Sequence, residues 1–234
     1  MGFFSDLFGF NSSKESTKST KQKPQSNLRI EDFWDSNSSR NSTASKGQQS
    51  AELFKKAVAM KRQGNFSEAI RLQKESIRIY PEDPELPNNY YSMAKTFYLM
   101  GDYDSAISSY MIYTGMCMMA NSAILNDFQK SQHGDNYAAQ RFVASFSNVA
   151  RHIGHALDKK MNPQQSNEGA RYYHDELMGK NAAGYSDANS AYGEKCRVLG
   201  FRAVEAQCHR FLENFQREKN LTMEVARAIA GIVG

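Results

Sequence analysis

Two stretches that repeat each other decide the fold: Gly64-Asn65-Phe66-Ser67-Glu68-Ala69-Ile70 and Gly101-Asp102-Tyr103-Asp104-Ser105-Ala106-Ile107. Each stretch opens with a glycine and a polar residue, continues with an aromatic residue, and ends with alanine and isoleucine. Apolar residues recur at helical spacing on both sides of each stretch, and Pro81 ends the first copy. Because a glycine permits a sharp reversal of the chain, each stretch predicts a tight turn between two helices.

The two copies resemble the tetratricopeptide family, whose turn and second-helix opening read Gly-Asp-Tyr-x-x-Ala-Ile. The turn glycines lie 37 residues apart, and the family's period is about 34 residues. Residues 84–86 resemble a short insertion, which accounts for the difference. The chain departs from the family at Gln73, where a large apolar residue is usual, and no proline closes the second copy. The resemblance implies two helix-turn-helix repeats within residues 50–115.

The rest of the chain, residues 116–234, has helical periodicity without a clean repeat. We expect further helices, with the first beginning inside the second repeat, at about 108–130, 137–160, 165–178, 189–219 and 222–232. Stable arrays generally need about three repeats or a cap, so these helices are expected to continue or cap the array, with residues 221–234 as the last capping helix. The predicted fold class is all-α, a tetratricopeptide-like helical hairpin array.

The amino-terminal extension differs in composition from everything after residue 50. Residues 11–49 consist mainly of Ser, Thr, Asn, Gln and Lys, which bury too little apolar surface to offset the entropy of ordering. We therefore expect a disordered, flexible tether. Two apolar islands interrupt it, one in residues 1–10 and one in residues 28–34. Their candidate docking residues are Phe3, Phe4, Leu7, Phe8 and Trp34.

The two islands predict different contacts. If the first island forms a short helix, its apolar side chains gather on one side, which suits an anionic membrane surface or a partner protein; the third alternative is disorder or packing within the same chain. The second island is interpreted either as a linear motif for another protein or as a strip that docks onto the same chain. A membrane-associated adaptor tethered through residues 1–10 is therefore the alternative to a purely protein-binding role.

Charge and cysteine content narrow the function classes. The net charge is +4 over 234 residues, and dispersed basic residues disfavour nucleic acid as a partner. Three cysteines without close pair spacing predict neither a disulfide framework nor a zinc site. No apolar run approaches the roughly 20 residues that span a bilayer, and the amino terminus lacks a secretory signal pattern. We expect a cytoplasmic protein, either free or peripheral at a membrane.

No motif predicts catalysis. The chain has no phosphate-binding glycine loop, no Gly-x-Ser-x-Gly elbow and no paired acid motif, so we expect no enzyme, no catalytic residues and no cofactor. His152 and His155 have the spacing of half a metal site, but the charged residues around them indicate a solvated face and no metal. Cys208 and His209 are adjacent on a helix and point in different directions, which excludes a nucleophile-base pair.

The remaining sulfur-containing residues predict packing. Free cysteines such as Cys196 and Cys208 usually behave as small buried apolar groups. The run from Met116 to Met119 is interpreted as the core face of a buried helix, with an adaptable binding surface as the alternative.

The predicted function is protein binding on the inner face of the first helix in each hairpin. In the tetratricopeptide family that face lines a concave groove, and residues three or four apart stay on one helix face. Tyrosine beside lysine suits an extended peptide or a helix bearing acidic and apolar side chains. The alternative is that the same residues pack against another part of this chain. The resemblance implies these groove residues: Phe54, Val58, Lys61, Asn88, Tyr91, Lys95 and Tyr98.

Overall fold

The computed structural model describes residues 40–81, 83, 85–121, 123–126, 137–164, 168–180 and 187–218, and within them all regular structure is helical. The predicted all-α class is confirmed. Residues 1–39, with both apolar islands, and the expected last helix at 221–234 lie outside the described residues. The longer helices are α3 (Arg40–Arg62), α4 (Phe66–Ile79), α5 (Leu86–Met100), α6 (Tyr103–Ala120), α8 (Tyr137–Ser145), α9 (Ser147–Met161), α10 (Glu168–Met178) and α11 (Ala191–Glu218), with a short 3₁₀ helix η1 (Asp187–Asn189) before α11.

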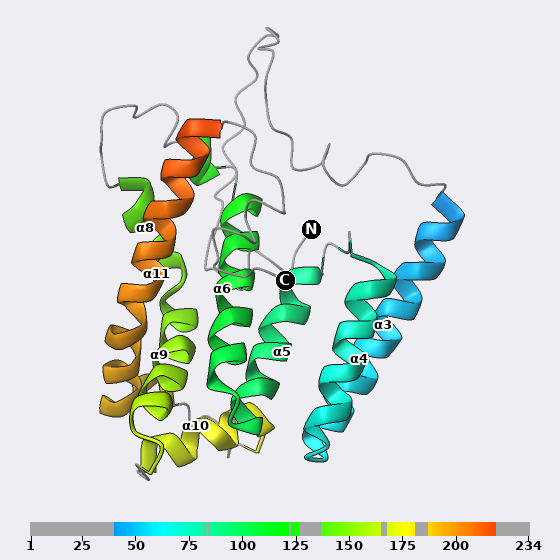
Figure 1. Ribbon diagram of the computed structural model, residues 1–234, viewed down its shortest axis with the longest axis horizontal. Coiled ribbons are helices and arrows are strands. Elements are labelled where there is room, and N and C mark those ends of the chain that lie inside the picture. The colour runs from blue at the N-terminus through cyan, green and yellow to red at the C-terminus, as the bar shows by residue number, and fades with distance from the viewer. Residues whose placement is uncertain are drawn as a thin grey trace, which may run out of the picture.

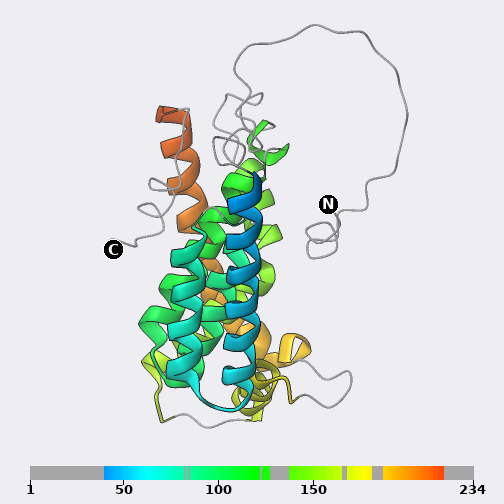
Figure 2. The ribbon, with the colours of Figure 1, turned by 90° about the vertical axis from the view of Figure 1, so that its right-hand side faces the viewer.

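The helices stand side by side as antiparallel pairs (Figure 1). The pairs α3/α4 and α5/α6 are the two hairpins that the repeated stretches predict. A third antiparallel pair, α9/α11, continues the row, although α10 and η1 intervene between its two helices in the chain. Figure 2 views the row from the end that α3 and α4 form.

Both predicted turns have the same chemistry. Gly64 and Gly101 adopt φ angles of 80° and 81°, a left-handed conformation that costs glycine little. The next residues, Asn65 and Asp102, cap the following helices, because each side chain accepts a hydrogen bond from the backbone N–H three residues further on, at 3.4 and 3.1 Å. The repeated sequence therefore specifies the end of one helix and the start of the next.

The third pair is held at close range by small residues. A Cβ atom built on Gly154 of α9 would lie 1.7 Å from the carbonyl oxygen of Cys196 on α11, and one built on Gly200 would lie 1.8 Å from the carbonyl oxygen of Ala150. Small residues spaced four apart on each helix thus face each other. The two backbones touch where a side chain would otherwise separate them.

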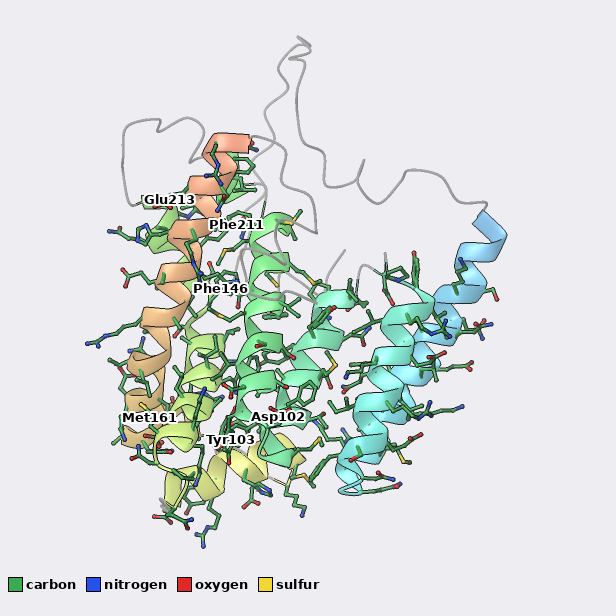
Figure 3. The ribbon with its side chains drawn as sticks, viewed as in Figure 1. Asp102, Tyr103, Phe146, Met161, Phe211 and Glu213 are labelled. Atoms are coloured by element: carbon green, nitrogen blue, oxygen red, sulfur yellow. The ribbon has the colours of Figure 1, made fainter. Side chains whose placement is uncertain are left out.

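The main core lies between α5/α6 and α9/α11. Tyr110, Met118, Phe142, Ile153 and Phe211 are almost fully buried there. Figure 3 shows Phe146 and Phe211 in the region between α11 and α6. Cys117 and Met118 of the methionine run belong to this core, Met119 packs against it, and Met116 packs in a separate cluster with Leu86 and Ile112, which confirms the packing interpretation of that run.

Helix α10 crosses one end of the row and makes a smaller cluster. Tyr173 and Leu177 of α10 pack with Tyr98, Ala106 and Ala156. Asp102 and Tyr103, labelled at the foot of α6, mark this end of the molecule in Figure 3. The cluster joins α10 to the second hairpin.

Three predicted boundaries are wrong. Helix α3 begins at Arg40, so the last ten residues of the expected tether are helical; Ser50 is buried against Ser76 of α4, with 2.8 Å between hydroxyl oxygens. Helix α6 ends at Ala120 rather than near 130, because Asn121 leaves the helix and accepts a hydrogen bond from the Ile124 N–H.

The third wrong boundary lies in the expected 137–160 helix, which is two helices. Phe146 leaves helical geometry between α8 and α9. Its side chain is 2% exposed within the core. The helix break coincides with burial of this ring, and the periodicity of the sequence does not predict the break.

Within the part of the chain that the structure describes, no helix is both long enough and apolar enough to cross a membrane.

Candidate binding groove

A groove of about 690 Å³ runs between α3 and α5 and extends to the junction of α8 and α9. Gly47, Ser50 and Ala51 line it from the first half of α3. Ser145, Asn148 and Val149 line it from α8 and α9. The groove therefore faces the first helix of each of the three antiparallel pairs.

Most of the expected groove residues line this space, namely Phe54, Lys61, Asn88, Tyr91 and Lys95. Val58 is half-buried on α3 and is not part of the lining. Tyr98 is 5% exposed, and its ring packs edge-on against Tyr173 of α10, with centroids 4.9 Å apart. The assignment of Tyr98 to the groove is wrong, because α10 covers that end of α5.

Tyr91 forms the centre of the groove floor. Its ring contacts the ring of Tyr113 at 4.9 Å between centroids, and its hydroxyl lies 2.7 Å from Nε2 of His152. The Nδ2 group of Asn148 donates a hydrogen bond to the same hydroxyl at 3.3 Å. Burial raises the pKa of Tyr91, so the phenol stays neutral and fixed in place.

Two lysines lie at one end of the groove. The Lys95 ammonium lies 4.2 Å from the centroid of the Tyr91 ring, a cation-π distance. Burial, and then the nearby Lys61 charge, lower the pKa of Lys95 to about 8. Burial, followed by the charge of Arg62, also lowers the pKa of Lys61. Among the ion pairs of the described residues, none includes Lys61 or Lys95.

The acidic residues of the groove lie at the opposite end and are engaged. Asp83 accepts a hydrogen bond from the Ser50 hydroxyl at 3.1 Å and another from the Glu85 backbone N–H at 2.9 Å. The Glu85 carboxylate accepts a hydrogen bond from the side chain of Asn88. Engaged carboxylates thus lie at one end of the groove, and Lys61 and Lys95, which have no ion-pair partner among the described residues, lie at the other. A third lining lysine, Lys55, is exposed on α3.

The histidines of α9 are buried, so the prediction of a solvated face is wrong. His152 is 1% exposed and His155 is 0% exposed. Both ring nitrogens of His152 are engaged, Nε2 by Tyr91 and Nδ1 by the Tyr173 hydroxyl at 2.7 Å. Burial lowers the pKa of each histidine. His152 therefore connects the groove floor to α10.

The charged neighbours that suggested a solvated face are themselves buried and paired. Arg151 is 4% exposed, and its guanidinium bonds to Glu176 of α10 at 2.7 Å and to Asp187 of η1 at 3.2 Å. Asp158 is 1% exposed and accepts hydrogen bonds from Tyr192 at 2.6 Å and from Lys195 at 2.9 Å. Partners on later helices supply the charge compensation that the local sequence does not contain.

A cysteine, a histidine and an aspartate meet in this network. Cys196 Sγ lies 3.6 Å from Nδ1 of His155, whose Nε2 lies 2.5 Å from Oδ2 of Asp187. The order resembles a nucleophile, a base and an orienting acid. All three side chains are 0% exposed, and burial raises the pKa of Cys196 to about 12. A buried neutral thiol is a poor nucleophile, so the geometry favours a structural link between α9 and α11.

The other thiols are also buried. Cys117 and Cys208 are unpaired and buried, which confirms the packing prediction for Cys208. Its neighbour His209 is only half-buried and lines a separate surface pocket with Phe201. Within the described ranges, no three His, Cys, Asp or Glu side chains are grouped as the ligands of a metal ion would be.

Comparison with known proteins gives no match: no family model matches the chain, and no similar curated protein or solved structure is found. The groove is therefore interpreted from its own chemistry.

Sequence reasoning missed two parts of the groove wall. The first half of α3 has the polar composition of a tether, and it is packed through contacts with residues far along the chain, such as those of Ser50 with Ser76 and Asp83. Asn148 and Val149 belong to a helix that is distant in sequence from both repeats. No local pattern predicts that α9 lies beside α5.

Proposed function

We propose that this chain is a non-catalytic, tetratricopeptide-like adaptor that binds a segment of another protein in the groove between α3 and α5. The preferred ligand is an extended peptide or a helix with acidic and apolar side chains. The observation that carries the proposal is the lysine pair: Lys61 and Lys95 border an apolar groove and lack an ion-pair partner among the described residues.

Electrostatics support an acidic ligand. Lowered pKa values mean that the two ammonium groups are destabilised in the free protein, by burial and, at Lys95, by the charge of Lys61. A ligand carboxylate between the two ammonium groups would supply an opposite charge to both of them and would offset the repulsion between Lys61 and Lys95. Charge-assisted hydrogen bonds of this kind are among the stronger ones.

Aromatic side chains support an apolar component. Phe54 and Tyr91 are half-buried on facing helices and leave ring surface toward the groove. Rigid aromatic rings contribute most of the binding energy in many protein interfaces. Because the Tyr91 hydroxyl is already bonded to His152 and Asn148, the ring is held in place before a ligand arrives.

The test uses fluorescein-labelled peptides of one length in which the apolar positions are constant and the charged positions are Glu, Gln or Lys. We expect the full chain to bind the Glu peptide most tightly. Lys61→Glu with Lys95→Glu should weaken that binding roughly 100-fold, taking about 1.5 kcal/mol for each charged contact. Because the two reversed charges attract lysine, the variant should gain affinity for the Lys peptide.

The matched control reverses two lysines outside the groove, Lys56 and Lys74, which are exposed on α3 and α4. This variant has the same net charge as the groove variant, so it separates a local contact from a general charge effect. We expect its affinity for the Glu peptide to stay within about twofold of the original, as exposed charges contribute little. Equal weakening by both variants, or no preference among the three peptides, would overturn the proposal.

A further inference from the structure

One segment of the chain has the chemistry that the groove lacks. Residues 28–35 read Leu-Arg-Ile-Glu-Asp-Phe-Trp-Asp, with three carboxylates and four large apolar side chains in eight residues. The lysine end of the groove needs carboxylates, and the rings of Phe54 and Tyr91 need apolar partners. The other apolar island, residues 3–10, carries one carboxylate and lies much further from the groove in sequence.

The length of chain before α3 is sufficient for this segment to reach the groove. Trp34 precedes Arg40 by six residues, which span at most about 20 Å when extended. Phe54 lies 14 residues into α3 from Arg40, or about 21 Å along the helix axis. A chain that folds back at Arg40 therefore brings Trp34 alongside the first half of α3, with Phe54 at the limit of its reach.

The same geometry aligns the charges. Glu31 precedes Arg40 by nine residues, at most about 31 Å when extended. Lys61 follows Arg40 by 21 residues of helix, about 31 Å along the axis. An extended segment antiparallel to α3 thus brings the Glu31 backbone at most to the level of the lysines, and the aromatic residues then lie between it and the start of the helix.

We infer that residues 28–35 of the same chain occupy the groove between α3 and α5 and compete there with the partner segment. This inference rests on the proposed function, since it makes the chain's own segment a ligand of the kind that the groove prefers. The tether converts the contact into an intramolecular one, for which short flexible linkers give millimolar effective concentrations. The consequence is a groove that opens only to a ligand able to displace residues 28–35.

Trp34 is the only tryptophan of the chain, so its fluorescence reports directly on the segment. The first measurement is acrylamide quenching of the full chain, native and in urea. We expect the native Trp34 to be several-fold less quenchable and its emission to be shifted to shorter wavelength. Lys61→Glu with Lys95→Glu should make Trp34 as quenchable as in urea, and the matched Lys56→Glu with Lys74→Glu control should leave it protected.

A charge exchange separates contact from unfolding. Adding Glu31→Lys and Asp32→Lys to the Lys61→Glu, Lys95→Glu variant should restore protection of Trp34, which a misfolded variant would not do. A native Trp34 as quenchable as in urea would overturn the inference. Protection that persists in the Lys61→Glu, Lys95→Glu variant would also overturn it, because Trp34 would then be docked elsewhere. Protection that is lost on dilution would overturn it too, because the occupant would then be a second copy of the chain.

Peptide binding distinguishes failure of this inference from failure of the proposed function. In the full chain, Trp34→Ala should vacate the groove and raise the apparent affinity for the Glu peptide about tenfold, if the segment occupies about nine grooves in ten. Unchanged affinity in Trp34→Ala, together with lysine-dependent peptide binding, would overturn only the inference. Absence of peptide binding in both proteins would overturn the proposed function as well.

Discussion

The contact between α9 and α11 leads to a sharp prediction about two glycines. Gly154→Ala and Gly200→Ala should each destabilise the protein, although alanine is ordinarily the better helix residue by about 1 kcal/mol. The structure places the new Cβ atoms 1.7 and 1.8 Å from carbonyl oxygens of the opposite helix. The obstacle in both cases is backbone, which cannot rotate away as a flexible side chain can.

The size of the effect follows from the distances. Ordinary contact begins near 3.4 Å, so α9 and α11 must separate by roughly 1.7 Å to accept either methyl group. Overpacking in a close-packed core typically costs about 1 to 3 kcal/mol, and a displacement of two helices belongs at the upper end. After the helix-propensity gain, we expect a net loss of about 2 kcal/mol for each variant.

Urea unfolding followed by circular dichroism measures this loss. For a typical dependence of about 2 kcal/mol per molar urea, the midpoint should fall by about 1 M. Gly47→Ala is the matched control, because Gly47 lies within helix α3 and its Cβ would be 3.6 Å from Cε1 of Tyr80, an ordinary contact distance. That variant should be more stable by up to about 1 kcal/mol. If Gly154→Ala were as stable as Gly47→Ala, the close approach of the two helices would be refuted.

Three further results are expected. Affinity for the Glu peptide should fall as the pH rises through about 8, because Lys95 loses its proton there, and Lys95→Arg should remove the dependence in a titration from pH 7 to 9. Acid should destabilise the fold. Burial lowers the folded pKa values of His152 and His155 below 6.5, so the unfolded chain binds more protons below that pH, and the free energy of unfolding should fall with pH in chemical denaturation. His152→Gln and His155→Gln should each reduce that slope. The three cysteine thiols should resist Ellman's reagent in the native protein and react in urea, since all three are buried; rapid native reaction of any one would contradict the burial.

The turns show what could be predicted before the structure. Gly64 and Gly101 are recognisable because only a few residue types adopt left-handed geometry without cost, and the following Asn65 and Asp102 are common helix caps. These are local effects within one turn of helix. They require no knowledge of the rest of the chain, so the two hairpins could be placed nearly to the residue.

The histidines show what could not be predicted. Around His152 and His155 the local sequence contains charges and suggests solvent, yet Arg151 finds Glu176 and Asp187 from 25 and 36 residues away. A charged residue is buried or exposed according to whether such a distant partner arrives. Composition near residue 50 led to the wrong boundary for the same reason, because Ser50 of α3 is bonded to Ser76 of α4 and to Asp83 just before α5.

The sequence by itself determined the helical class, both hairpin turns and most of the groove residues on α3 and α5, because these depend on periodicity and on conformational preferences that act over a few residues. Only the tertiary structure decided that α9 forms the far wall of the groove, that α10 covers Tyr98, and that the acidic and lysine ends are separated. Those features arise where helices distant in the chain meet, and their contacts carry no local signature.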